Sequence, residues 1–265
     1  MTNLAVIGSG AFGTTFALIA ADAGAHVRIL ARDRRLASAV NRRHRNDKYL
    51  PGIVLPSTIT AGTDPAEVLQ EAEIVLVAVA AQAADPLLKR IADAVPGQAV
   101  VVSLMKGVEL GSGRRMSEVI SQVLERSAEQ VACVSGPNLA RQLAQRQPAG
   151  TVVASANLAT AERVAAALST DYLRTYTSSD LVGVELCGAV KNVIAFACGV
   201  ASGLGFGANT VTTLMTRGLA ELTRLGLAYG ANLETFSGLA GVGDLAVTCL
   251  SPVSRNHRAG LALGQ

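Results

Sequence analysis

Cysteine is scarce in this sequence and follows no recognisable chemical spacing. The four residues, Cys133, Cys187, Cys198 and Cys249, form no CxxC pair and no zinc-type cluster, and three of them lie in apolar runs. Because disulfide frameworks and metal sites depend on such spacings, we expect free thiols, no bound metal and a reducing intracellular environment.

Concentrated charge and long apolar runs are also missing. The net charge is only +3, and the densest basic stretch, residues 41–48, has no Phe, Tyr or Trp among its charges. This composition argues against nucleic acid as a partner. The N-terminus has no basic region before its apolar residues, and no segment reaches the ~18 uninterrupted apolar residues of a membrane span. We therefore predict a cytoplasmic protein without a membrane span.

The residues that are present indicate a globular α/β protein. Half of the 265 residues are hydrophobic and 16% are charged, which is enough for one large domain or two ordinary ones. From residue 3 to about residue 178, short β-branched runs alternate with helical patterns, as in βαβ units with a mostly parallel sheet. The predicted strands cover residues 4–8, 26–31, 57–61, 73–79, 99–104, 130–135, 151–155 and 174–178, and the helical candidates include 12–23, 33–44, 113–126 and 158–168.

The strand pattern stops near residue 180. Residues 180–201 and 208–229 are predicted to be helices, residues 237–245 a glycine-rich loop, and residues 251–260 a turn that enters another helix. We therefore expect a Rossmann-like doubly wound domain over residues 1–179, followed by an all-helical substrate domain over residues 180–265.

A glycine motif opens the chain in the context of a dinucleotide site. The stretch GSGAFG, from Gly8 to Gly13, fits G-x-G-x-x-G and lies directly between a predicted strand and a predicted helix. Gly8 permits a tight turn, Gly10 lets the backbone approach a pyrophosphate, and Gly13 allows close packing of helix on strand. A glycine turn kept only for packing is the alternative.

The end of the second predicted strand bears on the choice of cofactor. The adenosine ribose is read about twenty residues after the glycines, where NAD sites usually carry an acidic residue. Here Arg32 occupies that point, and a guanidinium suits a 2′-phosphate, so we expect NADP(H) to be preferred with NAD(H) still usable. A solvated helix start is the alternative for Arg32, and Asp33 would serve NAD if the register differs by one.

Lysine is rarer than arginine and therefore more informative. The chain has four lysines among 23 basic residues, and Lys48 and Lys89 lie in charged contexts typical of a surface. Lys106 follows the fifth predicted strand, at an edge where doubly wound folds bind ligands. Lys191 lies in an apolar helical pattern with no carboxylate three or four residues away, so its partner must come from elsewhere in the fold or from a ligand. A solvated loop lysine and a snorkelling lysine are the respective alternatives.

Several motifs along the chain together resemble the NAD(P)-dependent glycerol-3-phosphate dehydrogenases. They are GSGAFGTTFA at the start, MKGVE around Lys106, SGPNLARQLA from Ser135, GVELCGAVKNVIA around Lys191, GFGANTVTTLMTRGLAELTRLG from Gly205, and GLAGVGDLAVTC with SRNHRAG near the end. The resemblance implies an oxidoreductase that interconverts dihydroxyacetone phosphate and sn-glycerol 3-phosphate by hydride transfer, in bacteria usually with NADPH and for phospholipid synthesis. It also implies that the substrate binds between a Rossmann-like domain and a helical domain.

The resemblance also implies roles for individual residues. Lys191 matches the acid/base lysine, assisted by Asp244, and Lys106 matches a lysine that contacts both substrate and cofactor. An unpaired Lys191 would then find its partner in a substrate oxygen. The implied cofactor contacts are Gly8, Gly10, Ala11, Phe12, Gly13, Arg32, Tyr49, Lys106, Ala140 and Arg255, and the implied substrate contacts are Lys106, Gly136, Asn138, Lys191, Asp244, Ser254, Arg255 and Asn256.

Two of these segments have simpler alternatives, and the chain differs from the family at its end. SRN at 254–256 also fits a helix cap with an exposed arginine, and Asp244 fits a turn residue after glycines. Family members continue beyond the sequence LALGQ with further helices, so either a fragment or a divergent short form is expected. The other function hypotheses are a related dehydrogenase of another substrate and a non-catalytic NADP(H)-binding module. The oligomeric state stays open, a homodimer included.

Overall fold

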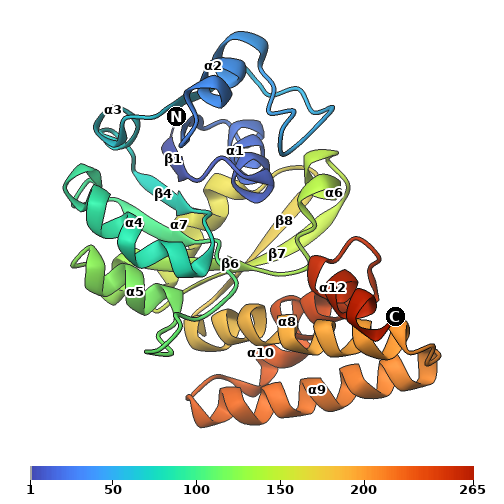
Figure 1. Ribbon diagram of the computed structural model, residues 1–265. Helices are drawn as coiled ribbons and strands as arrows, with labels where there is room; N and C mark the ends of the chain where they lie inside the picture. Colours follow the sequence, from blue (N-terminus) through green and yellow to red (C-terminus); the bar gives the residue numbers. More distant parts are fainter. Residues whose placement is uncertain (1) are drawn as a thin grey trace. The chain divides into compact units, whose positions relative to one another are not determined.

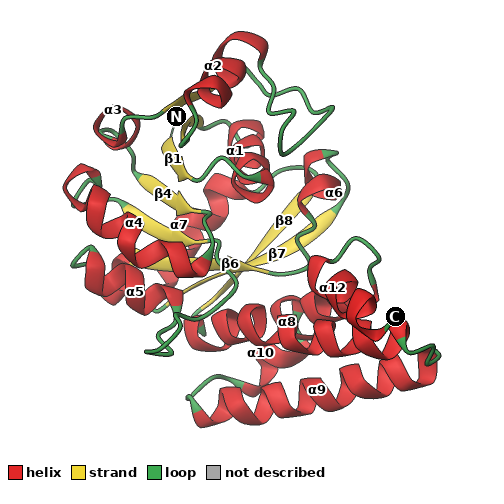
Figure 2. Cartoon of the chain, viewed as in Figure 1, coloured by secondary structure: helices red, strands yellow, loops and turns green. Residues whose placement is uncertain are grey.

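The computed structural model describes residues 2–265, and the chain divides into two compact units. The first, here called the sheet unit, runs to Val134 and resumes over Asn138–Ser179. The second, here called the helical unit, comprises Ser135–Pro137 and Asp180–Gln265. Figures 1 and 2 show strands in the first unit and helices throughout the second.

The described residues of the sheet unit, with Ser135 at the end of one strand, form one eight-stranded sheet in the order β3-β2-β1-β4-β5-β6-β7-β8. The strands are β1 (Asn3–Ile7), β2 (His26–Leu30), β3 (Ile59–Gly62), β4 (Ile74–Val77), β5 (Val100–Ser103), β6 (Val131–Ser135), β7 (Ala149–Ser155) and β8 (Leu173–Ser178). Strands β1 to β6 pair in parallel, as do β7 and β8. Each of these strands overlaps a run predicted from the sequence. The predicted doubly wound, mostly parallel sheet is confirmed.

Helices cover both faces of this sheet. They are α1 (Ala11–Asp22), α2 (Arg34–Arg43), α3 (Pro65–Leu69), α4 (Ala84–Ile91), α5 (Met116–Val123), α6 (Ala140–Ala144) and α7 (Leu158–Leu168), with the short 3₁₀ turns η1 (Ala81–Ala83), η2 (Ala92–Ala94) and η3 (Ala128–Gln130). Side chains alternate along each strand, so Val6 joins a core with α1, α2, α6 and α7, whereas Ile7 joins a core with α3, α4 and α5.

The helical unit is built on one long helix. Its elements are α8 (Leu181–Gly203), α9 (Ala208–Ala228), α10 (Leu233–Ser237), the π-helical turn η4 (Leu239–Gly243), α11 (Asp244–Leu250) and α12 (Arg255–Gly264). Helix α8 packs against α9, α11 and α12. By its length and apolar composition this helix could cross a membrane, but half of its most apolar stretch is buried in the structure. The core helix of a globular protein has the same length and composition, so these features are weak evidence for a membrane span.

Helices α8 and α12 pack with their backbones in close contact. Gly199 and Gly203 on α8 face Gly260 and Gly264 on α12, and a Cβ atom at any of the four would collide with backbone atoms of the other helix. The glycine spacing of four residues puts each pair on one helix face. This close packing fixes the first turn of α12 beside the middle of α8.

The segment 237–245 is not the loop that its glycines predicted. It contains the end of α10, the π-helical turn and the start of α11. Gly241 explains the difference, because a Cβ atom there would overlap the backbone of Phe236, so only glycine lets the wide turn close. The prediction of a loop was wrong because glycine usually disfavours helix, and tertiary packing overrides that preference here.

The buried cysteines give a test of this packing. All four cysteines are reduced and buried. Burial raises the pKa of Cys187 to about 12 and raises the pKa values of Cys198 and Cys249 above their usual range. At about pH 8 the reactive thiolate of Cys187 is then only about 10⁻⁴ of the total. We expect Ellman's reagent to label the native protein very slowly and all four thiols after denaturation; rapid labelling of the native protein would contradict the packing.

Candidate functional site

The turn between β1 and α1 has the backbone geometry of an anion site. Gly8 has φ +114°, and a Cβ atom on it would lie 2.5 Å from the carbonyl oxygen of Ala78. A Cβ atom on Gly13 would overlap the Gly8 carbonyl, whereas one on Gly10 meets no described atom within 4 Å. Gly8 and Gly13 therefore serve the fold, and Gly10 leaves open space at the helix end.

The first turn of α1 supplies the donors for such a site. Its N-cap is Gly10, and among the described residues no side chain caps it and no acidic residue lies in its first turn. The helix is 12 residues long, so its N-terminal N–H groups and dipole favour a bound phosphate. The open space at Gly10 and the uncapped N–H groups fit the pyrophosphate of a dinucleotide.

Asn46 holds this turn from the loop after α2. Its amide donates to the Ser9 carbonyl at 2.9 Å and to the Thr14 hydroxyl at 2.7 Å. The residue is 2% exposed, and its Oδ1 is a buried acceptor without a hydrogen-bond partner among residues 2–265. Sequence reasoning missed Asn46. Its only signal was its position three residues before Tyr49, in a loop already suspected of flanking the cofactor.

At the end of β2, Arg32 and Asp33 have different environments. Arg32 is exposed, and Asp33 caps α2 by accepting from the backbone of Arg35 at 2.8 Å. Lys48 lies 4.0 Å from the Asp33 carboxylate and 5.2 Å from the centre of the Tyr49 ring. The Asp33 side chain is thus engaged in the fold of α2, while the predicted contacts of Arg32 and Tyr49 with a cofactor stay predictions.

Lys106 and Ala140 both connect to α1. The Lys106 ammonium lies 5.9 Å from the centre of the Phe12 ring, which is two residues beyond Gly10. The Thr15 hydroxyl lies 3.1 Å from the Ala140 carbonyl, which fixes the start of α6 against α1. The structure therefore groups the predicted cofactor residues of the sheet unit around the first turn of α1, except Arg32 and Tyr49, which lie after β2.

Gly136 and Asn138 follow β6. Gly136 adopts φ +151°, a conformation that favours glycine. The Asn138 amide donates to the Thr151 hydroxyl at 2.8 Å, and its Oδ1 is buried with no hydrogen-bond partner in the described part of the chain. A buried carbonyl acceptor of this kind fits a ligand hydroxyl, so the predicted substrate contact of Asn138 remains open.

Lys191 is the best-defined feature of the helical unit. Only 5% of the residue is exposed, and its ammonium donates to Asp244 Oδ1 at 2.5 Å and to the Thr248 hydroxyl at 2.8 Å. Thr248 in turn donates to the Asp244 carbonyl at 2.6 Å, and Ser135 donates to Asp244 Oδ2 at 3.4 Å. An ammonium is thus held next to a carboxylate at a site almost closed to water.

These contacts correct one expectation and add one residue. Lys191 has its partner within the fold, and that partner is Asp244, the residue that the resemblance assigned to assist it. The expectation that Lys191 lacks a partner until a substrate oxygen binds was wrong. Thr248 was missed because residues 237–245 were predicted to be a loop. Only in a helix does Thr248, four residues after Asp244, lie on the same face.

The start of α12 lies against α8 near Lys191. The Asn256 amide donates to Asn192 Oδ1 at 2.8 Å, and Ser254 is the N-cap of α12, accepting from the His257 backbone at 3.3 Å. Arg255 is the exposed first residue of the helix. The helix-cap alternative is therefore observed for Ser254, and the phosphate-binding roles of Arg255 and Asn256 stay predictions.

Comparisons with known proteins agree on one family. The family models described as the N-terminus and the C-terminus of NAD-dependent glycerol-3-phosphate dehydrogenase match residues 3–161 and 180–265. A glycerol-3-phosphate dehydrogenase (NAD(P)+) of Parafrankia sp. is 53% identical over 265 residues, which is 100% of this chain and 79% of the relative. The same enzyme of Corynebacterium aurimucosum is 51% identical and is covered to 80%.

A solved structure agrees with these sequence matches. The crystal structure of glycerol-3-phosphate dehydrogenase from Coxiella burnetii has a TM-score of 0.93 and 35% sequence identity to this chain. The match covers 99% of this chain and 80% of that one.

The glycines at 10 and 13 allow binding and folding to be tested separately. We expect Gly10→Ala to keep the melting temperature and to weaken NADPH binding at least about tenfold, because the new methyl group enters only the open space. Gly13→Ala should instead lose about 1–3 kcal/mol of stability through overpacking. Thermal unfolding and titration by NADPH fluorescence, unobstructed by tryptophan because the chain has none, measure both. Tight NADPH binding by Gly10→Ala would contradict the assignment.

The ion pair in the helical unit predicts an uneven stability pattern. Asp244→Ala should cost about 3–5 kcal/mol, because it leaves a buried ammonium without its carboxylate. Replacing both residues, as Lys191→Met with Asp244→Leu, should recover most of that loss. Arg163→Ala, which removes an exposed pair with Glu73, serves as the control and should cost about 0–1 kcal/mol. Denaturant unfolding checks the pattern, and equal effects for Asp244→Ala and Arg163→Ala would refute it.

Proposed function

Since this chain belongs to the family of NAD-dependent glycerol-3-phosphate dehydrogenases, we propose that it interconverts dihydroxyacetone phosphate and sn-glycerol 3-phosphate with a nicotinamide cofactor. The observation that carries this proposal furthest is the buried Lys191 ammonium, held at 2.5 Å by Asp244. An enclosed cation beside a fixed carboxylate suits proton transfer to a substrate oxygen.

The cofactor belongs to the sheet unit in this proposal. The α1 N-terminus with Gly10, Ala11 and Phe12 holds the pyrophosphate, and Arg32 faces the adenosine ribose. An exposed guanidinium at that position favours a 2′-phosphate, so we propose that NADP(H) is preferred and that NAD(H) is also used. When bound, the reduced cofactor supplies a hydride.

The helical unit supplies the proton. Reduction of a ketone puts a hydride on its carbon and leaves negative charge on its oxygen, which must be neutralised. Lys191 donates its ammonium proton to that oxygen, and Asp244 and Thr248 keep the ammonium in one place. In the reverse direction the neutral Lys191 amine accepts the alcohol proton. Lys106 stabilises the negative charge or holds the substrate.

The phosphate of the substrate needs its own contacts. Arg255 and Asn256 lie at the start of α12, whose dipole adds to the positive charge of the arginine. The side-chain oxygen Oδ1 of Asn192 accepts from the Asn256 amide at 2.8 Å and sets the orientation of that side chain. We assign these two residues to the phosphate, with Gly136 and Asn138 as contacts to the rest of the substrate. We also propose that the protein is cytoplasmic, that it forms a homodimer and that it supplies glycerol 3-phosphate for phospholipid synthesis.

A rate measurement tests the proposed function. The wild-type protein should consume NADPH when dihydroxyacetone phosphate is added, and more slowly with NADH. Lys191→Ala should still bind NADPH but lose about 10²–10⁴-fold in turnover, because the proton donor is gone. Arg163→Ala, which removes an exposed cation, is the control and should keep the wild-type rate. A Lys191→Ala variant with wild-type turnover would exclude Lys191 as the proton donor.

A further inference from the structure

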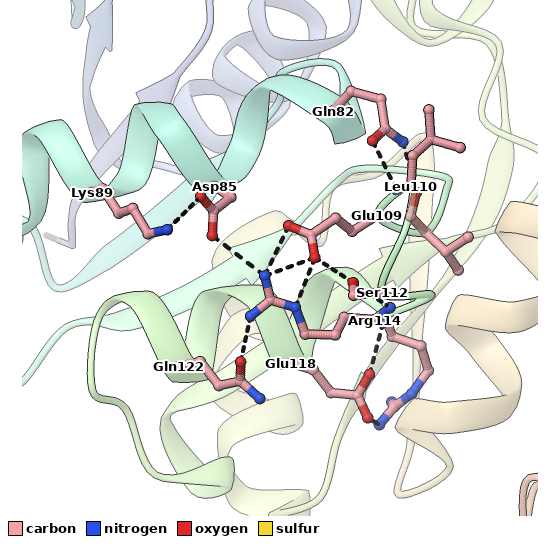
Figure 3. Close-up of polar contacts among 11 residues, drawn as sticks. Gln82, Asp85, Lys89, Glu109, Leu110, Ser112, Arg114, Glu118 and Gln122 are labelled. Carbon is pink, nitrogen blue, oxygen red and sulfur yellow. Dashed lines mark hydrogen bonds and ion pairs between the residues drawn. The ribbon is translucent and has the colours of Figure 1, made fainter.

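The loop that carries Lys106 is anchored by a glutamine side chain from a neighbouring segment. This loop, residues 104–115, connects β5 to α5 and is here called the Lys106 loop. Gln82, in the turn η1 after β4, donates through Nε2 to the Val108 carbonyl at 2.8 Å and accepts through Oε1 from the Leu110 backbone at 2.9 Å. One side chain thus binds the loop backbone on both sides of Glu109, as Figure 3 shows.

The loop is also closed on itself beyond that point. Glu109 donates from its backbone to the Arg114 carbonyl at 2.9 Å, and Val108 and Arg115 form an isolated antiparallel bridge. The Arg114 guanidinium binds both carboxylate oxygens of Glu109, at 2.8 Å each, and lies 3.4 Å from Asp85 on α4. Bidentate pairing of this kind fixes direction as well as distance.

The charge of Glu109 persists at neutral pH. Hydrogen bonds from the Ser112 hydroxyl and the Arg114 guanidinium hold the pKa of the Glu109 carboxyl below its usual range. The Asp85 carboxyl also has a lowered pKa, chiefly through its hydrogen bond with Lys89. The network that closes the loop is therefore ionised under the conditions in which a cofactor would bind.

The residues on either side of Lys106 are fixed as well. Leu104 donates to the Val77 carbonyl at 2.9 Å, which ties the start of the loop to β4. A Cβ atom on Gly107 would lie 3.1 Å from the Cβ atom of Ala81, so the loop rests directly on η1. Residue 104 is bonded to β4, residue 107 lies against η1 and residue 108 is bonded to Gln82, so the backbone is held on both sides of Lys106.

From these contacts we propose that Gln82 is a positioning residue, which acts through the Lys106 loop to hold the Lys106 ammonium beside the first turn of α1. The proposal rests on the proposed function, because it gives Lys106 a reacting partner to be aligned with. Displacing a group that aligns substrate and cofactor by about 1 Å can cost up to about 10²-fold in rate. Gln82 is exposed, so its two hydrogen bonds have little to contribute to stability.

The first experiment compares two glutamines that bind loop backbone at opposite ends of the parallel strands. Gln82 lies after β4, whereas Gln130 lies just before β6 and donates to the Gly97 carbonyl at 2.9 Å. Gln82→Ala should lower kcat/KM for dihydroxyacetone phosphate about tenfold at an unchanged melting temperature. Gln130→Ala should leave kcat/KM at the wild-type value. Gln82→Glu, which loses the donor to Val108 but keeps an acceptor for Leu110, should fall between.

A double-mutant cycle shows whether the effect passes through Lys106. In a Lys106→Met background, Gln82→Ala should have no further effect on kcat/KM, because the group that it positions is absent. An unchanged tenfold effect in that background would overturn the proposal, since Gln82 would then act elsewhere. Equal kcat/KM values for wild type and Gln82→Ala would overturn it as well.

A spectroscopic readout does not depend on activity. The chain has only four lysines, so reductive methylation with ¹³C-formaldehyde gives few lysine signals, and Lys106→Arg identifies the Lys106 signal by its loss. In the protein without ligands, Gln82→Ala should move this signal toward those of the exposed lysines, Lys48 and Lys89, while Gln130→Ala should not. An unmoved signal would refute the positioning role.

The two readouts separate this proposal from the proposed function. A wild-type protein that fails to oxidise NADPH with dihydroxyacetone phosphate removes the proposed reaction, yet the Lys106 signal still reports whether Gln82 holds the loop. A protein that is active, with a Lys106 signal and kcat/KM both insensitive to Gln82→Ala, keeps the reaction and removes the positioning role.

Discussion

The ion pair between Lys191 and Asp244 is the interaction around which the helical unit is organised. Taking an ammonium and a carboxylate out of water costs more than their attraction commonly returns, and apolar residues of similar size would be as stable or more so. The unit nevertheless brings three segments to this point: α8 with Lys191, α11 with Asp244 and Thr248, and the end of β6 with Ser135. We therefore attribute the pair to the proposed proton transfer, because apolar residues of similar size would serve stability at least as well.

The sheet unit depends on a different constraint, the parallel direction of its first six strands. That direction puts the ends of β1, β2, β4, β5 and β6 at one edge, where the glycine turn, Arg32, Gln82, the Lys106 loop and Asn138 follow their strands. Backbone geometry shapes the glycine turn, because Gly8 and Gly13 allow its close packing and Gly10 leaves open space beside it. Side chains from later loops, Asn46 and Gln82 among them, then hold the segments that a ligand would touch.

A feature of the fold or of the site could be predicted from the sequence when residues close together in the chain determine it. The strands, the long helices and the glycine turn were predictable because periodicity and a short motif determine them within a few residues. Spacing alone could not give the partner of Lys191, because Asp244 is 53 residues away in a segment predicted to be a loop; only the family resemblance had assigned Asp244 to assist Lys191. Thr248 was missed with the same segment, because its spacing of four residues from Asp244 has meaning only in a helix. Asn46 and Gln82 were missed because each binds residues far along the chain, and no spacing in the sequence indicates such a contact.

The claim that Lys191 is the proton donor is tested most directly by chemical rescue. Lys191→Ala removes the ammonium and leaves space beside Asp244 for a small amine of similar chemistry. Turnover of NADPH and dihydroxyacetone phosphate by this variant should rise with added ethylammonium and then saturate, while the wild-type rate stays constant. A variant whose low rate does not respond to the amine, or a wild-type protein that responds equally, would contradict the account.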